Sequence, residues 1–172
     1  AIDEGQRICV YGDYDCDGIM ATVILFSYLY ECGADVFYYI PERSEGYGLN
    51  TAAIDEIAAK ETDLIITVDN GISAVAEAEY VYSKGMKLVI TDHHQQGEVL
   101  PRAEAVVDPH RHDCTSPFKH MCGAGIALKL TAALDGGDYT MALEQFGDLA
   151  AIATVADIVS LSGENRFLVS YG

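Results

Sequence analysis

Five short apolar runs in the first 107 residues constrain the fold more than any other feature of the sequence. Each run is apolar throughout instead of alternating with polar residues, which is typical of strands covered by helices on both faces. Stretches of helical character lie between them, so we expect parallel strands joined by helical crossovers. The runs are Ile8–Tyr11, Val36–Ile40, Leu64–Val68, Leu88–Thr91 and Ala105–Val107. The pattern predicts an α/β fold with a doubly wound, five-stranded, mainly parallel sheet flanked by helices.

The helices are predicted from capping residues and apolar spacing. One helix is expected from about Ile19 to Cys32, where a glycine closes it, and another around Ile54–Ala58. A third is expected to be N-capped by Ser73. The last part of the chain, from Gly123 to about Val159, has the character of a helical C-terminal segment. No repeat or linker divides the chain, so residues 1–172 are expected to form one domain.

The charge balance limits how this protein can meet nucleic acid. Asp and Glu number 27 against 10 Lys and Arg, which gives a formal net charge of −17. Such a surface repels phosphate backbones, whereas nucleic-acid binders normally carry a basic surface. We expect both a solvated acidic exterior and a cluster of carboxylates that binds cations. Any grip on nucleic acid must then come from bound metal, a local patch or another domain.

The sequence also bears on the compartment. No apolar run approaches the roughly 20 residues that span a bilayer, and the N-terminus lacks the plan of a signal peptide. None of the five cysteines forms a CxxC pair, so we interpret them as reduced thiols. We therefore expect a cytoplasmic protein with no membrane partner.

Acidic side chains follow three successive predicted strands. The first strand runs into residues 12–18, which hold three alternating aspartates, the third into Asp69, and the fourth into Asp92. Ligands of open α/β sheets bind at the carboxyl ends of the strands. One such aspartate is commonly a cap or turn residue, but three successive strand ends are harder to explain by capping. Carboxylates crowded at one edge would repel one another or take up protons unless cations neutralise them.

The type of side chain indicates which cation. An aspartate-rich set with one or two histidines and no thiolate suits manganese or magnesium better than structural zinc. Two such ions about 3.5–4 Å apart can share a bridging carboxylate and activate water for attack on a phosphate. Asp69 lies centrally and suits the bridging position, while Asp157 has apolar neighbours in sequence and is expected to be buried. These side chains therefore favour a site for two divalent cations, either manganese or magnesium.

Four segments resemble, in order, the motifs of the DHH phosphoesterase superfamily. They are residues 12–18, 68–73, 92–94 (Asp-His-His) and 154–161. Within the superfamily the chain is most similar to the bacterial RecJ exonucleases, because residues 41–50, 122–125 and 163–166 also look RecJ-like. The resemblance implies a hydrolase of phosphodiester bonds, a 5′→3′ exonuclease specific for single-stranded DNA that acts in DNA repair and recombination.

The resemblance also implies a set of metal ligands. One metal would be held by Asp13 and Asp69. The second metal would be held by the set Asp15, Asp69, His93 and Asp157.

Further roles follow from the same resemblance. Asp92 would orient the two histidines that follow it. His94 would face the scissile phosphate and stabilise the transition state, which makes it catalytic together with Asp92 and the bridging Asp69. Arg43 would contact phosphate, and Tyr47 would shape the path of the substrate. Single-stranded DNA would be the main partner, with a single-strand-binding protein and a helicase as further partners.

Two departures from the family pattern stand out. Many members carry a histidine two residues before the first metal aspartate, whereas this chain has Tyr11, a poor ligand at neutral pH. The smaller C-terminal substrate-binding domain of the family has no counterpart after the fourth motif. We therefore expect a truncated chain that holds metal, cleaves poorly alone, and lacks most of the DNA contacts.

Other functions share parts of this pattern. Short-RNA or nucleotide phosphatases and cyclic-dinucleotide phosphodiesterases of the same superfamily have the same metal chemistry, so they remain alternatives. A phosphoacceptor receiver domain also has acids after the first and third strands and a hydroxyl near the end of the fourth, here Thr91. Such a domain needs a lysine after its fifth strand, where this chain has Asp108, and it leaves the paired histidines unexplained.

A second group of coordinating side chains lies between residues 110 and 122. Its spacing matches no familiar zinc pattern, so we expect a surface loop without metal. The group comprises His110, His112, Cys114, His120 and Cys122.

Overall fold

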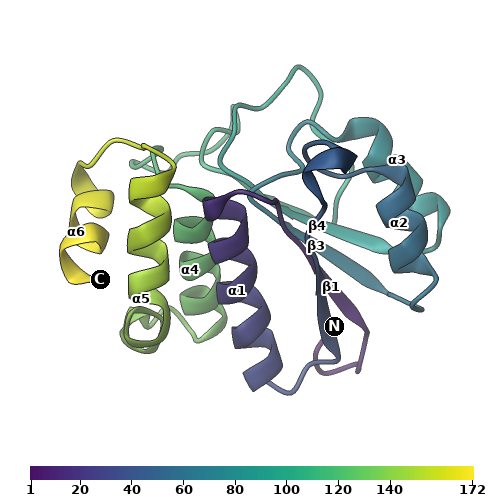
Figure 1. Ribbon diagram of the computed structural model, residues 1–172, viewed down its shortest axis with the longest axis horizontal. Coiled ribbons are helices and arrows are strands. Elements are labelled where there is room, and N and C mark those ends of the chain that lie inside the picture. The colour runs from purple at the N-terminus through teal and green to yellow at the C-terminus, as the bar shows by residue number, and fades with distance from the viewer.

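A five-stranded sheet forms the centre of the computed structural model, which describes residues 1–172 (Figure 1). Every pair of neighbouring strands is parallel, and the order across the sheet is β2-β1-β3-β4-β5. The strands are β1 (Ile8–Tyr11), β2 (Val36–Tyr39), β3 (Leu64–Val68), β4 (Lys87–Thr91) and β5 (Ala105–Val107). The predicted doubly wound, five-stranded sheet is confirmed.

Helices cover both faces of the sheet. One face is covered by α1 and α4, with α5 and α6 packed outside them, and the other by α2 and α3 (Figure 1). The helices are α1 (Cys16–Glu31), α2 (Thr51–Ala58), α3 (Val75–Ser83), α4 (Gly123–Leu134), α5 (Tyr139–Ala156) and α6 (Gly163–Tyr171), and a short 3₁₀ helix spans Arg43–Glu45. None of these helices combines the length and apolarity that crossing a membrane requires.

Strand β1 shows why its sequence is apolar throughout. Successive side chains of a strand point to opposite faces of the sheet. Ile8 and Val10 therefore enter the core beneath α1 and α4, while Cys9 and Tyr11 enter the core beneath α2 and α3. Both cores exclude water, so a polar group on either face of β1 needs a hydrogen-bond partner within the protein.

Two details of the predicted helices need correction. Helix α1 begins at Cys16 rather than near Ile19, because the Asp15 side chain accepts the Gly18 N–H and caps the helix. Ser73 is not an N-cap: α3 begins two residues later, after Ala74, which makes no capping hydrogen bond through its side chain. The C-terminal segment is helical as predicted and consists of α4, α5 and the short α6.

The order of the strands fixes where a site can form. The strand order has a switch point between β1 and β3, because β2 is added on one side of β1 and β3 on the other. Open α/β sheets bind ligands at such a switch point, outside the carboxyl ends of the strands. The loops that follow β1, β3 and β4 meet at this edge.

Candidate metal centre

The loops at the switch point bring together side chains that can bind metal. Candidate ligand atoms lie within 4.8 Å of one another in three overlapping or adjacent groups. These groups are Asp13 with Asp15 and Asp69, Asp69 with His93 and His94, and Asp17 with His93 and Asp157. All five ligands implied by the resemblance lie in these groups, although Asp15 is grouped with Asp13 instead of with His93 and Asp157.

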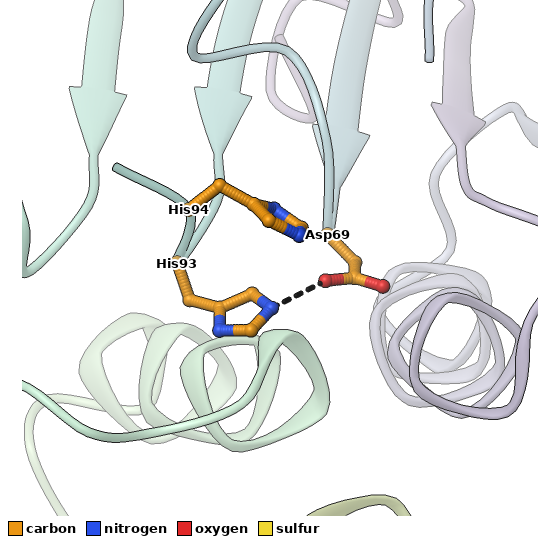
Figure 2. A group of neighbouring side chains, drawn as sticks. All are labelled: Asp69, His93 and His94. Carbon is orange, nitrogen blue, oxygen red and sulfur yellow. Dashed lines mark ion pairs between the residues drawn. The ribbon is translucent and has the colours of Figure 1, made fainter. Parts of the chain in front are cut away.

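Asp69 lies at the centre of the arrangement. It follows β3 directly, and its side chain points toward His93, which with His94 follows the neighbouring strand β4 (Figure 2). Its Oδ1 lies 3.0 Å from His93 Nε2, yet this buried oxygen accepts no hydrogen bond. Burial raises the pKa of Asp69, and the nearby carboxylates of Asp17 and Asp15 raise it further. The backbone of Asp69 has a φ of 62°, in the left-handed region that few non-glycine residues adopt.

Other carboxylate oxygens at this edge also lack partners. Asp13 is 1% exposed, and neither of its carboxylate oxygens accepts a hydrogen bond. Burial raises the pKa of Asp13. Oδ2 of Asp157 is likewise buried without a partner. Because unpaired buried carboxylates are costly, this set of oxygens, with one imidazole beside it, fits a site for hard divalent cations.

Asp17 is a member of the site that sequence reasoning missed. Its Oδ2 lies 3.6 Å from His93 Nε2, and the same carboxylate accepts the backbone N–H groups of Gly123 and Ala124 at 2.6 and 2.8 Å. These N–H groups are free because they lie at the N-terminus of α4. A carboxylate has about four acceptor positions, so Asp17 can still bind metal. The alternation of aspartates in residues 12–18 was the only sequence signal for it.

Helix α4 approaches the site unusually closely. A Cβ atom added to Gly123 would lie 2.5 Å from Cβ of Asp69 and 2.7 Å from its Oδ1. Only glycine therefore lets the first turn of α4 rest against Asp69. The N-terminal end of a helix carries partial positive charge, which stabilises the carboxylates that it faces.

Asp92 and His94 form a fully hydrogen-bonded unit beside this cluster. Oδ1 of Asp92 lies 2.7 Å from His94 Nδ1 and accepts the backbone N–H groups of His93 and His94, while Oδ2 accepts that of Ile72. Burial raises the pKa of Asp92, but these hydrogen bonds outweigh it and leave the pKa below its usual value. The hydrogen bond with Asp92 raises the pKa of His94. Asp92 thus orients the ring of His94 directly, and His93 only through its backbone.

Comparison with known proteins identifies the family. Residues 7–154 match the model of the DHH family, N-terminal domain. The chain belongs to the DHH family. It is 44% identical over 173 aligned residues to the single-stranded-DNA-specific exonuclease RecJ of Bacillus subtilis, which covers the whole chain but 22% of that protein.

Solved structures of RecJ show the same fold. A crystal structure of exonuclease RecJ bound to manganese superposes with a TM-score of 0.86 at 38% identity, over the whole chain and 44% of that structure. RecJ of Thermus thermophilus in complex with Mn²⁺ gives a TM-score of 0.81 at 35% identity, over the whole chain and 24% of that structure. The chain thus spans less than half the length of each of these DHH relatives.

Of the two residues implied as substrate contacts, Tyr47 lies beside His94 and Arg43 lies beside Tyr14 in the loop after β1. The Tyr47 hydroxyl donates to the backbone carbonyl of Asp69 at 2.8 Å and lies 3.2 Å from His94 Nδ1, and the two rings pack edge to face. The guanidinium of Arg43 lies 5.1 Å from the centre of the Tyr14 ring. Tyr47 therefore contacts the site itself, while Arg43 lies in the exposed 3₁₀ helix at its margin.

Two other sequence features lie away from the ligand atoms. Tyr11, at the position where many DHH proteins have histidine, points into the core beneath α2 and α3, and its hydroxyl donates to the Gly48 carbonyl. The coordinating side chains of residues 110–122 form no group with metal-binding geometry. Asp157 is less buried than predicted: its Oδ2 is buried, but its side chain as a whole is 24% exposed and its neighbour Ile158 is 89% exposed.

Proposed function

We propose that this chain is the metal-binding catalytic domain of a RecJ-like exonuclease that hydrolyses single-stranded DNA from the 5′ end. One observation carries the proposal: buried carboxylate oxygens without partners converge beside His93 at the carboxyl edge of the sheet. The similarity to RecJ proteins, two of which were solved with manganese, supports the same function.

The geometry favours a particular division of ligands. Asp13, Asp15 and Asp69 would hold one divalent cation. Asp69 would also contribute to the second cation and bridge the two, because it lies between Asp13 and His93. The remaining ligands of the second cation would be Asp17, His93 and Asp157. We propose manganese as the preferred ion, with magnesium as the alternative.

The residues of the chain then have separate tasks. When bound, two divalent cations polarise phosphoryl oxygens and supply a nucleophile at neutral pH. Asp92 accepts a hydrogen bond from Nδ1–H of His94, which fixes the ring and favours its protonated form. Nε2–H of His94 would then donate a hydrogen bond to the phosphoryl group of the substrate. The ring of Tyr47 packs edge to face against the ring of His94 and restrains it further.

We propose that most contacts with DNA are made by regions outside this chain. The net charge of −17 opposes binding of a phosphate backbone, and Arg43 is a cation available at the margin of the site. The small share of each RecJ relative that the chain spans supports further substrate-binding regions in the complete protein. A single-strand-binding protein, a helicase and a cytoplasmic location stay predictions.

Hydrolysis of a small phosphodiester tests the catalytic centre separately from DNA binding. Bis(p-nitrophenyl) phosphate needs only the metal centre, so the chain should hydrolyse it slowly with Mn²⁺ and not in EDTA. Asp69→Asn and His94→Ala should each lower the rate at least about 100-fold. His112→Ala, in an exposed loop, should leave it unchanged.

DNA substrates test the specificity of the same centre. The complete protein should release nucleotides from the 5′ end of single-stranded DNA and spare duplex DNA. Mn²⁺-dependent hydrolysis of short RNA or cyclic dinucleotides in preference to DNA would instead favour the other superfamily activities. Hydrolysis of the small diester that persists in Asp69→Asn would contradict the proposed centre.

A further inference from the structure

His110 contacts the metal-binding loop from outside the ligand set. It lies in the loop after β5, and its Nδ1 is 2.5 Å from the backbone carbonyl of His93. A carbonyl oxygen only accepts hydrogen bonds, so Nδ1 of His110 must carry the proton and donate. The neutral ring is thereby fixed as the Nδ1–H tautomer. Among the histidines of residues 110–122, His110 is the one whose ring contacts a candidate metal ligand.

The loop that holds His110 is itself restrained. Oδ1 of Asp108, buried at the end of β5, accepts the backbone N–H of His110 at 2.7 Å. Lys119 donates from Nζ to the carbonyls of Pro109 and Cys114, at 2.6 and 2.7 Å. These bonds close the loop on both sides of His110, so its ring has a defined direction toward His93.

The position of His93 depends on its backbone, because its ring makes no hydrogen bond. Its Nε2 lies 3.0 Å from Asp69, 3.6 Å from Asp17 and 3.8 Å from Asp157, so it must reach carboxylates from three separate elements. No hydrogen bond holds its ring, in contrast to the ring of His94, which Asp92 fixes. The backbone of His93 is held on one side by Asp92, which accepts its N–H, and on the other by His110.

We propose that His110 is a positioning residue of the metal centre, which sets the place of His93 Nε2 through the backbone carbonyl of His93. This inference rests on the proposed metal-binding function and adds to it a residue that is neither a ligand nor a substrate contact. Partners that orient a metal-binding histidine typically change metal affinity by about 10- to 100-fold when they are removed. The contact here acts on the peptide of the ligand instead of on its ring.

Manganese titration of the 172-residue chain tests the role of His110 directly. His110→Ala should weaken binding of one Mn²⁺ ion by at least about 10-fold while the other ion binds nearly as in the parent. His110→Asn should recover affinity to within about 3-fold, because its amide nitrogen takes the position of Nδ1. His112→Ala serves as the matched control, since His112 lies in the same loop and contacts only Gln96 through its hydrogen bonds.

A second pair of variants keeps the test decisive if His110→Ala unfolds in EDTA. In His110→Gln the amide nitrogen takes the position of Nε2 instead of Nδ1, so it is misplaced for the hydrogen bond to the His93 carbonyl. This variant should bind one Mn²⁺ about 10-fold more weakly than His110→Asn. Equal affinities of the Asn and Gln variants, or parental affinity of His110→Ala, would overturn the inference. Failure of the parent itself to bind Mn²⁺ would instead contradict the proposed metal centre.

Discussion

The loops after β3 and β4 begin with aspartates that are alike in burial and opposite in surroundings. Asp69 is 2% exposed and Asp92 is 1% exposed. Both oxygens of Asp92 accept hydrogen bonds, and its pKa is lowered despite burial. Oδ1 of Asp69 accepts none, and burial among other carboxylates raises its pKa. The difference shows that hydrogen bonding, rather than burial or residue type, separates a structural aspartate from one that fits a cation.

Removing the charge of Asp92 should have the largest effect on the fold. In Asp92→Asn one carboxylate oxygen becomes an NH₂ group, which cannot accept from the N–H donors around it. At least one charge-assisted hydrogen bond, to a backbone N–H or to Nδ1–H of His94, is therefore lost. Such bonds contribute about 1.5–3 kcal/mol each, so the free energy of unfolding of the metal-free chain should fall by about that amount. Urea denaturation in EDTA measures it. Unchanged stability would mean that Asp92 is not the anchor of its loop.

The close approach of α4 to Asp69 gives the next effect. In Gly123→Ala the new Cβ would meet the Asp69 carboxylate, so α4 must shift and lose its hydrogen bonds to Asp17. We expect a loss of about 1–3 kcal/mol in the free energy of unfolding and weaker Mn²⁺ binding. Gly97→Ala is the control, because nothing lies within 4 Å of the added atom. Equal behaviour of the two variants would contradict the close packing of α4.

The pH dependence of stability should differ between the two aspartates. The pKa of Asp69 is raised in the folded chain, so its favourable contribution is complete below the unfolded pKa, near about 3.9, and is lost as pH rises through the folded pKa. Asp92, with a lowered pKa, behaves oppositely and loses its contribution in acid. In EDTA, Asp69→Asn should therefore gain more stability over the parent at about pH 8 than at about pH 5. A gain that grows in acid would contradict the raised pKa.

Local sequence patterns were sufficient for the strands but not for all contacts at the site. The apolar runs predicted the sheet because both faces of each strand are buried in a doubly wound fold. Asp69 was predicted from its place after β3, which ends at the switch point, whereas the role of His93 as a ligand was implied by the family resemblance. The N-cap at Ser73 was wrong because the Ile72 N–H is bound by Asp92, which shapes the loop before α3 from 20 residues away.

The missed residues depend on contacts between distant segments. Asp17 is joined to α4 by hydrogen bonds that span 106 and 107 residues of sequence. His110 contacts the carbonyl of His93, a backbone atom that side-chain motifs do not reveal. Both contacts depend on where the loops meet in space, which capping signals and hydrophobic periodicity do not determine.

Calorimetric titration of Mn²⁺ into the chain, beside Asp69→Asn, tests the central claim most directly. If the unpartnered oxygens of Asp69 and its neighbours form a cation site, the parent should bind about two ions, and the variant should lose at least one. Asp92→Asn should retain both ions with lower affinity, since its oxygens already have partners. Parental binding by Asp69→Asn, or no binding by the parent, would contradict the claim that the end of β3 is built to hold metal.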